Sequence, residues 1–390
     1  MTGSALHQEV DALLSGDWEA EYVRRVAEIR RRIEARRTVL LFGAGYLGRH
    51  VLEELKDSCF EPVAFVDNDP ERWGSSVGGL LVVSPAEALT RYDDEALWLI
   101  TVYTNSAVIA QCSSLGAPWV TCAEFAAARE EVDGPSFDFG RPEALLKSAA
   151  HIRAVADIWA DPESEAEYLG QVKWRFTLDY TALKASRNPS ETYFPKGIYR
   201  RRDDDVFVDC GAFTGDTIQA FLDATKGRFR LIVAVEPDAV NARSLRHRMD
   251  AWKLQGVGPM IIEECAAGSH EHKMRFATTG TAGSSLGTGA DLVRVRPLDD
   301  ILDDRTPTFI KLDVEGAEKD ALLGARRTIE RHAPVMAVCL YHRPSDLWEL
   351  PLLLRSMNPR YSLYLRRYSD ECWETICYAV PPDRIVLNRS

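Results

Sequence analysis

Two acidic residues and a glycine-rich turn in the middle of the chain have the types and spacing of a cofactor site. Asp209 ends an apolar run, the turn after it contains Gly211 and Gly215, and a second apolar run ends at Glu236. This order predicts a strand, a turn that opens a helix, and a second strand, which together form a crevice for an adenosine-bearing cofactor. The carboxylate of Glu236 is then placed to accept hydrogen bonds from ribose hydroxyls.

The turn differs from a dinucleotide fingerprint, because it reads D-x-G-x-x-x-G rather than G-x-G-x-x-G. A looser turn suits a ligand that has no pyrophosphate, and S-adenosylmethionine is such a ligand. Its glycines would let backbone N–H groups approach the methionine carboxylate, and Asp209 could accept from the ammonium group. A further strand leads to a turn that includes Ala266, where backbone groups could meet the adenine edge.

Polar residues also follow two later apolar runs. Asp313 and Glu315 come after one of them and His342 after the other, so all three are expected at the ligand-binding edge of a parallel sheet. If the ligand is S-adenosylmethionine, a methyl donor, methyl transfer to a hydroxyl would require an acceptor held in line and a general base. His342 is the leading candidate for that base because imidazole titrates near neutrality, and Asp313 and Glu315 are alternatives.

Two other interpretations of these residues stay open. A histidine that only packs in the core or at the surface is more common than a catalytic one. The three side chains could also hold a divalent ion that acidifies the hydroxyl. We expect a site without a metal.

A second glycine-rich turn lies near the N-terminus. Gly43, Gly45 and Gly48 follow an apolar run, and Asp67 ends the next one, in the pattern of a nucleotide-binding fingerprint. Asp67 would favour an unphosphorylated ribose, so NAD or a nucleotide-sugar is the candidate ligand. No Tyr-x-x-x-Lys pair for hydride transfer occurs in this region, and a scaffold or dimerisation lobe without a ligand is the alternative.

The apolar runs alternate with helical patterns, which predicts parallel sheets built from βαβ units. We expect an α/β fold with two doubly wound Rossmann-like domains in tandem, joined by a helical linker. Early strands are expected at residues 39–42, 62–66 and 97–102. The expected parts are a helical segment (1–37), a Rossmann-like nucleotide-binding lobe (38–130), a helical linker and substrate-proximal segment (131–199), and a second Rossmann-like domain with the S-adenosylmethionine crevice (200–390).

The composition of the chain limits the classes of partner that we expect it to bind. The formal net charge of −12 disfavours nucleic acid and anionic membranes, and no apolar run approaches the roughly 18 residues of a membrane span. Eight scattered cysteines without a C-x-x-C pair indicate reduced thiols. These features predict a cytoplasmic protein that acts on a small-molecule acceptor without membrane insertion, with homo-oligomerisation left open.

Together these motifs resemble the FkbM family of S-adenosylmethionine-dependent methyltransferases over about residues 190–381. The resemblance rests on F-V-D-C-G-A-F-T-G-D-T, V-A-V-E-P-D, R-P-L-D-D-I-L, I-K-L-D-V-E-G-A-E and E-T-I-C-Y-A-V-P. It implies a class I methyltransferase fold in which Asp209, Gly211 and Gly215 surround the methionine part of the cofactor. It also implies that Glu236 holds the ribose and that Asp313 faces the reacting centre.

The chain departs from similar family members where they carry R-H-Y, because it has Arg366-Arg367-Tyr368. This difference concerns the acceptor and not the cofactor. The resemblance implies O-methylation of a hydroxyl on a sugar, a glycolipid or a secondary metabolite. The alternatives are an NAD- or nucleotide-sugar-dependent enzyme in which the methyltransferase-like domain only binds, and a catalytically silent sensor or scaffold.

Overall fold

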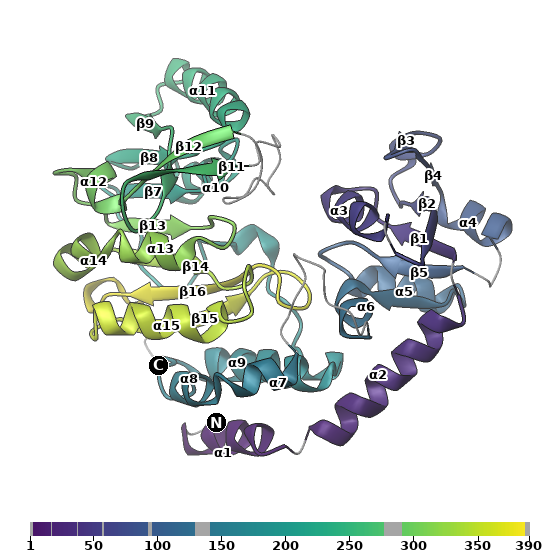
Figure 1. The fold of residues 1–390 in the computed structure, drawn as a ribbon. Coiled ribbons are helices and arrows are strands. Elements are labelled where there is room, and N and C mark those ends of the chain that lie inside the picture. The colour runs from purple at the N-terminus through teal and green to yellow at the C-terminus, as the bar shows by residue number, and fades with distance from the viewer. Residues whose placement is uncertain are drawn as a thin grey trace.

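The computed structural model describes residues 3–16, 18–36, 38–56, 58–92, 96–128, 141–276 and 291–386. Two α/β halves each contain their own sheet, and a layer of helices lies along the lower side of the C-terminal half (Figure 1). The expected boundary at residues 130–131 lies outside the described residues.

The N-terminal half is a six-stranded sheet in the order β3-β4-β2-β1-β5-β6. All neighbouring strands are parallel except β3 and β4. Its strands are β1 (Thr38–Phe42), β2 (Glu61–Val66), β3 (Ser76–Val77), β4 (Leu80–Val83), β5 (Leu97–Ile100) and β6 (Trp119–Thr121). Its helices are α3 (Tyr46–Leu55), η1 (Pro70–Arg72), α4 (Pro85–Tyr92), α5 (Ser106–Ser114) and α6 (Cys122–Ala128). Apolar side chains pack on both faces of the sheet, as expected for parallel strands covered by helices.

The C-terminal half is a seven-stranded sheet in the order β15-β16-β14-β13-β7-β8-β9. Five strands are parallel, and an antiparallel pair closes one side. Its strands are β7 (Val206–Cys210), β8 (Leu231–Val235), β9 (Met260–Glu263), β13 (Phe309–Leu312), β14 (Val335–Cys339), β15 (Ser362–Arg367) and β16 (Thr375–Val380). Its helices are α10 (Asp216–Thr225), α11 (Ala239–Leu254), α12 (Leu298–Leu302), α13 (Glu318–Leu323), α14 (Arg326–His332), α15 (Asp346–Met357) and η5 (Pro382–Arg384).

A small three-stranded sheet, which the sequence did not predict, lies beside this half. It consists of β10 (Ala266–Ala267), β11 (His272–Phe276) and β12 (Asp291–Arg296), in the order β10-β12-β11. Because β10 directly follows β9, this sheet continues the edge of the main sheet at which the adenine contact was expected.

A helical connection joins the halves through α7 (Pro142–Leu146), α8 (Ala149–Val155), α9 (Pro162–Thr177), η3 (Tyr180–Ala182) and η4 (Pro189–Glu191). Helix α9 is capped at its start by Asp161, whose Oδ1 accepts from the backbone N–H of Ser164 at 2.8 Å. Its apolar stripe is buried at Tyr168, Val172 and Phe176.

The first helical segment consists of two helices that pack against different halves. The side chains of α1 (Gly3–Leu14) join the core around α8 and α9, whereas Val26, Ile29 and Ile33 of α2 (Glu19–Glu34) join the N-terminal core. Figure 1 shows α2 running from the helical layer to the N-terminal half. Its arginines make intramolecular contacts, among them Arg30 with the carbonyl of Ala128 and Arg32 with that of Trp119.

Candidate active site

A cavity of about 650 Å³ lies where the carboxyl ends of the C-terminal sheet face the N-terminal half. The strand order reverses between β7 and β13, and open α/β sheets bind ligands at such a point. The volume is typical of a small-molecule site. The strand-end residues that line it include Gly211, Glu236, Asp313 and His342.

The N-terminal half contributes to this cavity as well. Tyr46, at the start of α3, and Tyr103 and Thr104, after β5, are among the lining residues. The loop 369–374 fixes the two halves together at this point, because Asp370 Oδ2 accepts from Ser106 N at 2.7 Å. The cavity is therefore formed by both halves of the molecule.

Gly211 is the glycine of the turn that borders the cavity. It has a φ of +76°, and a Cβ at this position would overlap the carbonyl oxygen of Asp313. Only glycine fits this close crossing of two strand ends. Gly215 also has a positive φ of +88°, but its missing Cβ makes room for Leu245 and Trp252 of α11. It therefore serves helix packing, and the cavity lining does not include it.

Glu236 lies at the end of β8 and lines the cavity, as expected. Its Oε2 accepts from Phe213 N at 2.8 Å and its Oε1 accepts from Asp238 N at 2.9 Å. A carboxylate oxygen can accept a second hydrogen bond, so both oxygens keep capacity for hydroxyl donors. Ala266 also lines the cavity, beside Cys265 and Ala267.

Asp209 does not occupy the position that the sequence suggested. It is fully buried, its Oδ1 lies 3.1 Å from Lys311 Nζ, and it is absent from the described residues that line the cavity. Lys311 Nζ also donates to the carbonyl of Gly211 at 2.8 Å. Asp209 therefore acts on the glycine turn through Lys311, because the parallel register puts these two residues side by side.

Lys311, which the sequence reasoning missed, is itself 1% exposed and lines the cavity. Burial opposes its charge, but Asp209 and Asp313 raise the pKa of its ammonium group. The signal available in the sequence was a lysine inside an otherwise apolar run, two residues before Asp313.

Asp313 is held by two tyrosines. Its Oδ2 accepts from the Tyr193 hydroxyl at 2.8 Å, and its Oδ1 accepts from the Tyr341 hydroxyl at 3.2 Å. Burial favours the neutral acid, but Lys311, His342 and the Tyr193 hydrogen bond together lower the pKa of this carboxyl. Asp313 is therefore an anion at neutral pH.

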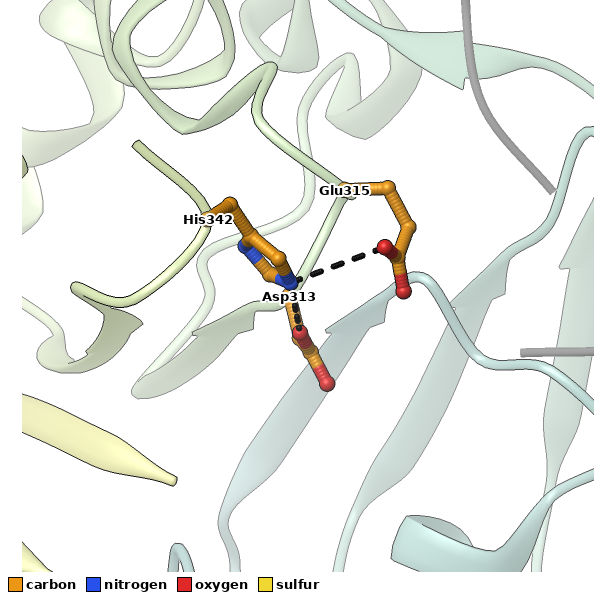
Figure 2. Close-up of side chains that lie close together, drawn as sticks. All are labelled: Asp313, Glu315 and His342. Atoms are coloured by element: carbon orange, nitrogen blue, oxygen red, sulfur yellow. Dashed lines mark ion pairs between the residues drawn. The ribbon is translucent and has the colours of Figure 1, made fainter. Parts of the chain in front are cut away.

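His342 lies against three carboxylates. Its Nδ1 is 2.8 Å from Glu318 Oε1, and its Nε2 is 3.5 Å from Asp313 Oδ1 and 3.7 Å from Glu315 Oε2. Figure 2 shows the side chains of Asp313 and Glu315 converging on the same ring nitrogen. The three residues proposed for catalysis from the sequence are thus brought together.

The surroundings of His342 oppose the predicted base role. Burial disfavours the charged ring, but Glu318, then Glu315 and Asp313, raise the pKa of His342 to about 10. An imidazolium cannot accept a proton at neutral pH. His342 therefore acts as a cation in this arrangement, and a carboxylate is the better base.

Glu374 is a lining residue that the sequence reasoning missed. Burial and the nearby Asp313 raise the pKa of its carboxyl to about 7. Its φ is +52°, and Tyr193, Phe213 and Glu315, which also line the cavity, have positive φ values too. Such backbone strain in non-glycine residues gathers at functional sites, but no local sequence pattern marks it.

The glycines of the second glycine turn lie outside this cavity. Gly48 packs directly on the backbone of Gly43, whereas a Cβ on Gly45 would meet open space. Asp67 Oδ2 accepts from Ala44 N at 2.9 Å, in the same way that Glu236 accepts from Phe213. None of the described cavity-lining residues is Gly43, Gly45, Gly48 or Asp67.

The pair Arg366 and Arg367 ties the C-terminal sheet to α9. Both side chains are buried, with Arg366 Nη2 at 2.5 Å from Asp161 Oδ2 and Arg367 Nε at 2.7 Å from Glu167 Oε1. Only the next residue, Tyr368, lines the cavity. Similar family members have histidine at the position of Arg367. In this chain Arg367 therefore stabilises the packing of β15 against α9.

The strand order, the glycine turn and the acidic strand ends define a methyltransferase-type α/β domain. Residues 209–368 match the model of the methyltransferase FkbM domain. The chain therefore carries an FkbM methyltransferase domain, and the resemblance seen in the sequence is confirmed.

The chain is also similar to the crystal structure of methyltransferase FkbM from Methylobacillus flagellatus KT. The two share 26% sequence identity with a TM-score of 0.74, over 97% of this chain and 100% of that chain. A putative rRNA-methylase from Clostridium thermocellum is 8% identical with a TM-score of 0.35, and it covers 52% of this chain and 98% of its own. A search of curated proteins finds no match.

Within the described residues, no helix combines the length and apolar character that a membrane crossing requires.

Proposed function

We propose that this protein is an S-adenosylmethionine-dependent methyltransferase that O-methylates a hydroxyl of a small molecule bound between its two halves. The observation that carries the proposal is the cavity itself, which joins the carboxylate of Glu236 to a cluster of ionisable groups at the point where the strand order reverses. The FkbM domain supports the same reaction class.

The residues present fit the cofactor. Glu236 keeps hydrogen-bonding capacity for ribose hydroxyls, and the apolar lining formed by Val235, Pro237, Ala266 and Phe276 suits an adenine ring. Gly211 lines the cavity without a side chain, so a ligand can lie against its backbone. S-adenosylmethionine would supply an electrophilic sulfonium methyl group here.

The acceptor side is aromatic and hydroxyl-bearing. Tyr103 packs edge-on against Trp373 with ring centroids 4.7 Å apart, and Tyr341 lies 5.9 Å from the same ring. Such amphipathic rings suit an acceptor with an apolar face and several hydroxyl groups, as in a sugar or a hydroxylated metabolite. Closing the acceptor between the halves would exclude water and hold its hydroxyl in line for attack.

Glu374 is the proposed general base. Its carboxyl lines the cavity, and a pKa of about 7 matches a base that works near neutral pH. In this scheme, Glu374 would take the proton of the acceptor hydroxyl, and the methyl group of a bound S-adenosylmethionine would pass to that oxygen with S-adenosylhomocysteine as the leaving group. Asp313 orients Tyr193 and Tyr341, and His342 with Lys311 balances the negative charge of the site.

Calorimetric titration with S-adenosylmethionine tests the cofactor assignment, with a matched pair of variants. Glu236→Ala removes the ribose acceptors and should weaken binding by roughly 10- to 100-fold, since a hydrogen bond to a charged group is worth about 1.5–3 kcal/mol. Asp67→Ala removes the equivalent carboxylate of the other turn and should leave binding unchanged. If the wild type did not bind S-adenosylmethionine, or if only Asp67→Ala lost it, the proposal would be wrong.

A further inference from the structure

We infer that Asp313, Glu315 and His342 form a binding site for one divalent metal ion, placed to bind the hydroxyl that is methylated. Each residue offers one ligand atom, and these atoms all lie within 4.8 Å of one another. The mixed set of one imidazole and two carboxylates suits a divalent ion such as Mn²⁺.

The two distances from His342 Nε2 to the carboxylates agree with a shared ion. Ligand atoms that bind one ion at about 2.1 Å each lie about 3–4.2 Å apart. His342 Nε2 is 3.5 Å from Asp313 Oδ1 and 3.7 Å from Glu315 Oε2, which is too far for good hydrogen bonds. The three side chains point toward one space, as Figure 2 shows.

A buried carboxylate behind the histidine is an independent observation. Glu318 is fully buried and lies 2.8 Å from His342 Nδ1, and the histidine side chain is only 9% exposed. Metal-ligating histidines commonly donate their second ring N–H to such a carboxylate, which fixes the ring and directs the other nitrogen at the ion. The ion would displace the Nε2 proton that His342 carries when no ion is bound, so ion binding would release a proton. Glu318 also accepts from Val314 N at 2.8 Å, so it is itself held in place.

The backbone holds Glu315 toward the same point. Its φ is +53°, a conformation that a non-glycine residue adopts at a cost of about 1–3 kcal/mol. The side chain remains 36% exposed, whereas that of Asp313 is 22% exposed. The ligand set is therefore reachable from the cavity, and an octahedral ion would keep positions for acceptor oxygens and water.

The catalytic consequence of this site rests on the proposed methyl transfer, whereas ion binding does not. An ion that binds the acceptor hydroxyl lowers its pKa, and the released proton would pass to Glu374. The best acceptor would then present two neighbouring oxygens, such as a vicinal diol, because both can bind the ion. Metal binding and cofactor binding can fail independently, so each is measured separately.

The test uses Mn²⁺ added to the full chain after removal of metals with EDTA and dialysis. Electron paramagnetic resonance of free Mn²⁺ should show one bound ion per chain, and spin-echo modulation should show coupling to an imidazole nitrogen. His342→Ala should remove that coupling. His342→Ala and Glu315→Gln should both weaken binding by more than about 100-fold, and Glu318→Gln by roughly 10- to 100-fold.

A double variant of two neighbouring histidines is the matched control. His270 and His272 have ring centroids 4.4 Å apart outside the cavity, and His270→Ala/His272→Ala should leave Mn²⁺ binding unchanged. Circular dichroism checks that each variant folds. If His342→Ala does not fold, the loss of Mn²⁺ binding in Glu315→Gln tests the site instead. No bound Mn²⁺ at millimolar concentration, or binding that depends on the control pair alone, would overturn the inference. S-adenosylmethionine titration of the same samples shows whether the proposed function fails with it.

Discussion

At the residue scale, Glu374 rather than His342 is the group whose pKa lies near neutral pH. The imidazole is surrounded by carboxylates, which raise its pKa to about 10, so it is cationic at neutral pH. The Glu374 carboxyl is buried near Asp313, and its pKa rises to about 7. The acid that titrates in the working range is therefore a glutamate, because burial and like charge shift it there.

The Glu374 assignment predicts both a rate loss and a pH profile. A carboxylate accepts a proton only when it is deprotonated, so kcat should rise with pH and level off above about 7. Glu374→Gln should lower kcat by roughly 10²- to 10⁴-fold and remove this rise. The measurement is methyl transfer against pH, with an acceptor found by screening sugars, glycolipids and hydroxylated metabolites.

Calorimetry on the same variant should give an unchanged affinity for S-adenosylmethionine. A Glu374→Gln enzyme that kept the wild-type pH profile would assign the base to another group, with Glu315 the next candidate because burial also raises its pKa to about 7.

At the element scale, α9 joins the helical layer to the C-terminal sheet through its first turn. Asp161 caps the helix and also pairs with Arg366, which is 4% exposed and lies on β15. Removal of one partner leaves a buried guanidinium with fewer contacts, in addition to the lost cap. Since Glu163 also lies 3.3 Å from Arg366, part of the pairing would remain.

Asp161→Ala should lower the free energy of unfolding by about 2–4 kcal/mol, which combines the lost cap with a weakened buried pair. Asp161→Asn is the matched variant, because asparagine caps a helix about as well as aspartate but carries no charge. It should fall between the wild type and Asp161→Ala in urea denaturation. Equal losses in both variants would mean that the ion pair alone matters.

Elements with a strong local pattern could be predicted from the sequence. The expected strands at 39–42, 62–66 and 97–102 correspond to β1, β2 and β5, because buried parallel strands are short continuous apolar runs. The small sheet was missed because β12 alternates charged and apolar residues and is largely exposed. The two parts of the N-terminal helical segment were not separated, since the turn at Gly16 interrupts one helical pattern only briefly.

At the scale of the whole molecule, the candidate site was only half predictable. The strand-end residues Glu236, Asp313 and His342 follow from local patterns and line the cavity. Contacts between distant parts of the chain do not follow from local patterns. Ser106 and Asp370 are 264 residues apart, yet their hydrogen bond helps to bring Tyr103 to Trp373. The second half of the cavity therefore becomes visible only in the folded chain.

The joint cavity predicts that the N-terminal half selects the acceptor. Tyr103→Ala removes one ring from the aromatic wall while leaving Glu236 and the glycine turn untouched. Since an aromatic pair contributes about 0.5–1.5 kcal/mol, KM for the acceptor should rise roughly 2- to 10-fold, and the affinity for S-adenosylmethionine should stay constant. Trp73→Ala is the control, because Trp73 is an exposed aromatic residue of the same half that does not line the cavity. A Tyr103→Ala enzyme with unchanged acceptor KM would place the acceptor entirely within the C-terminal half, because the ring at Tyr103 would then lie outside its reach.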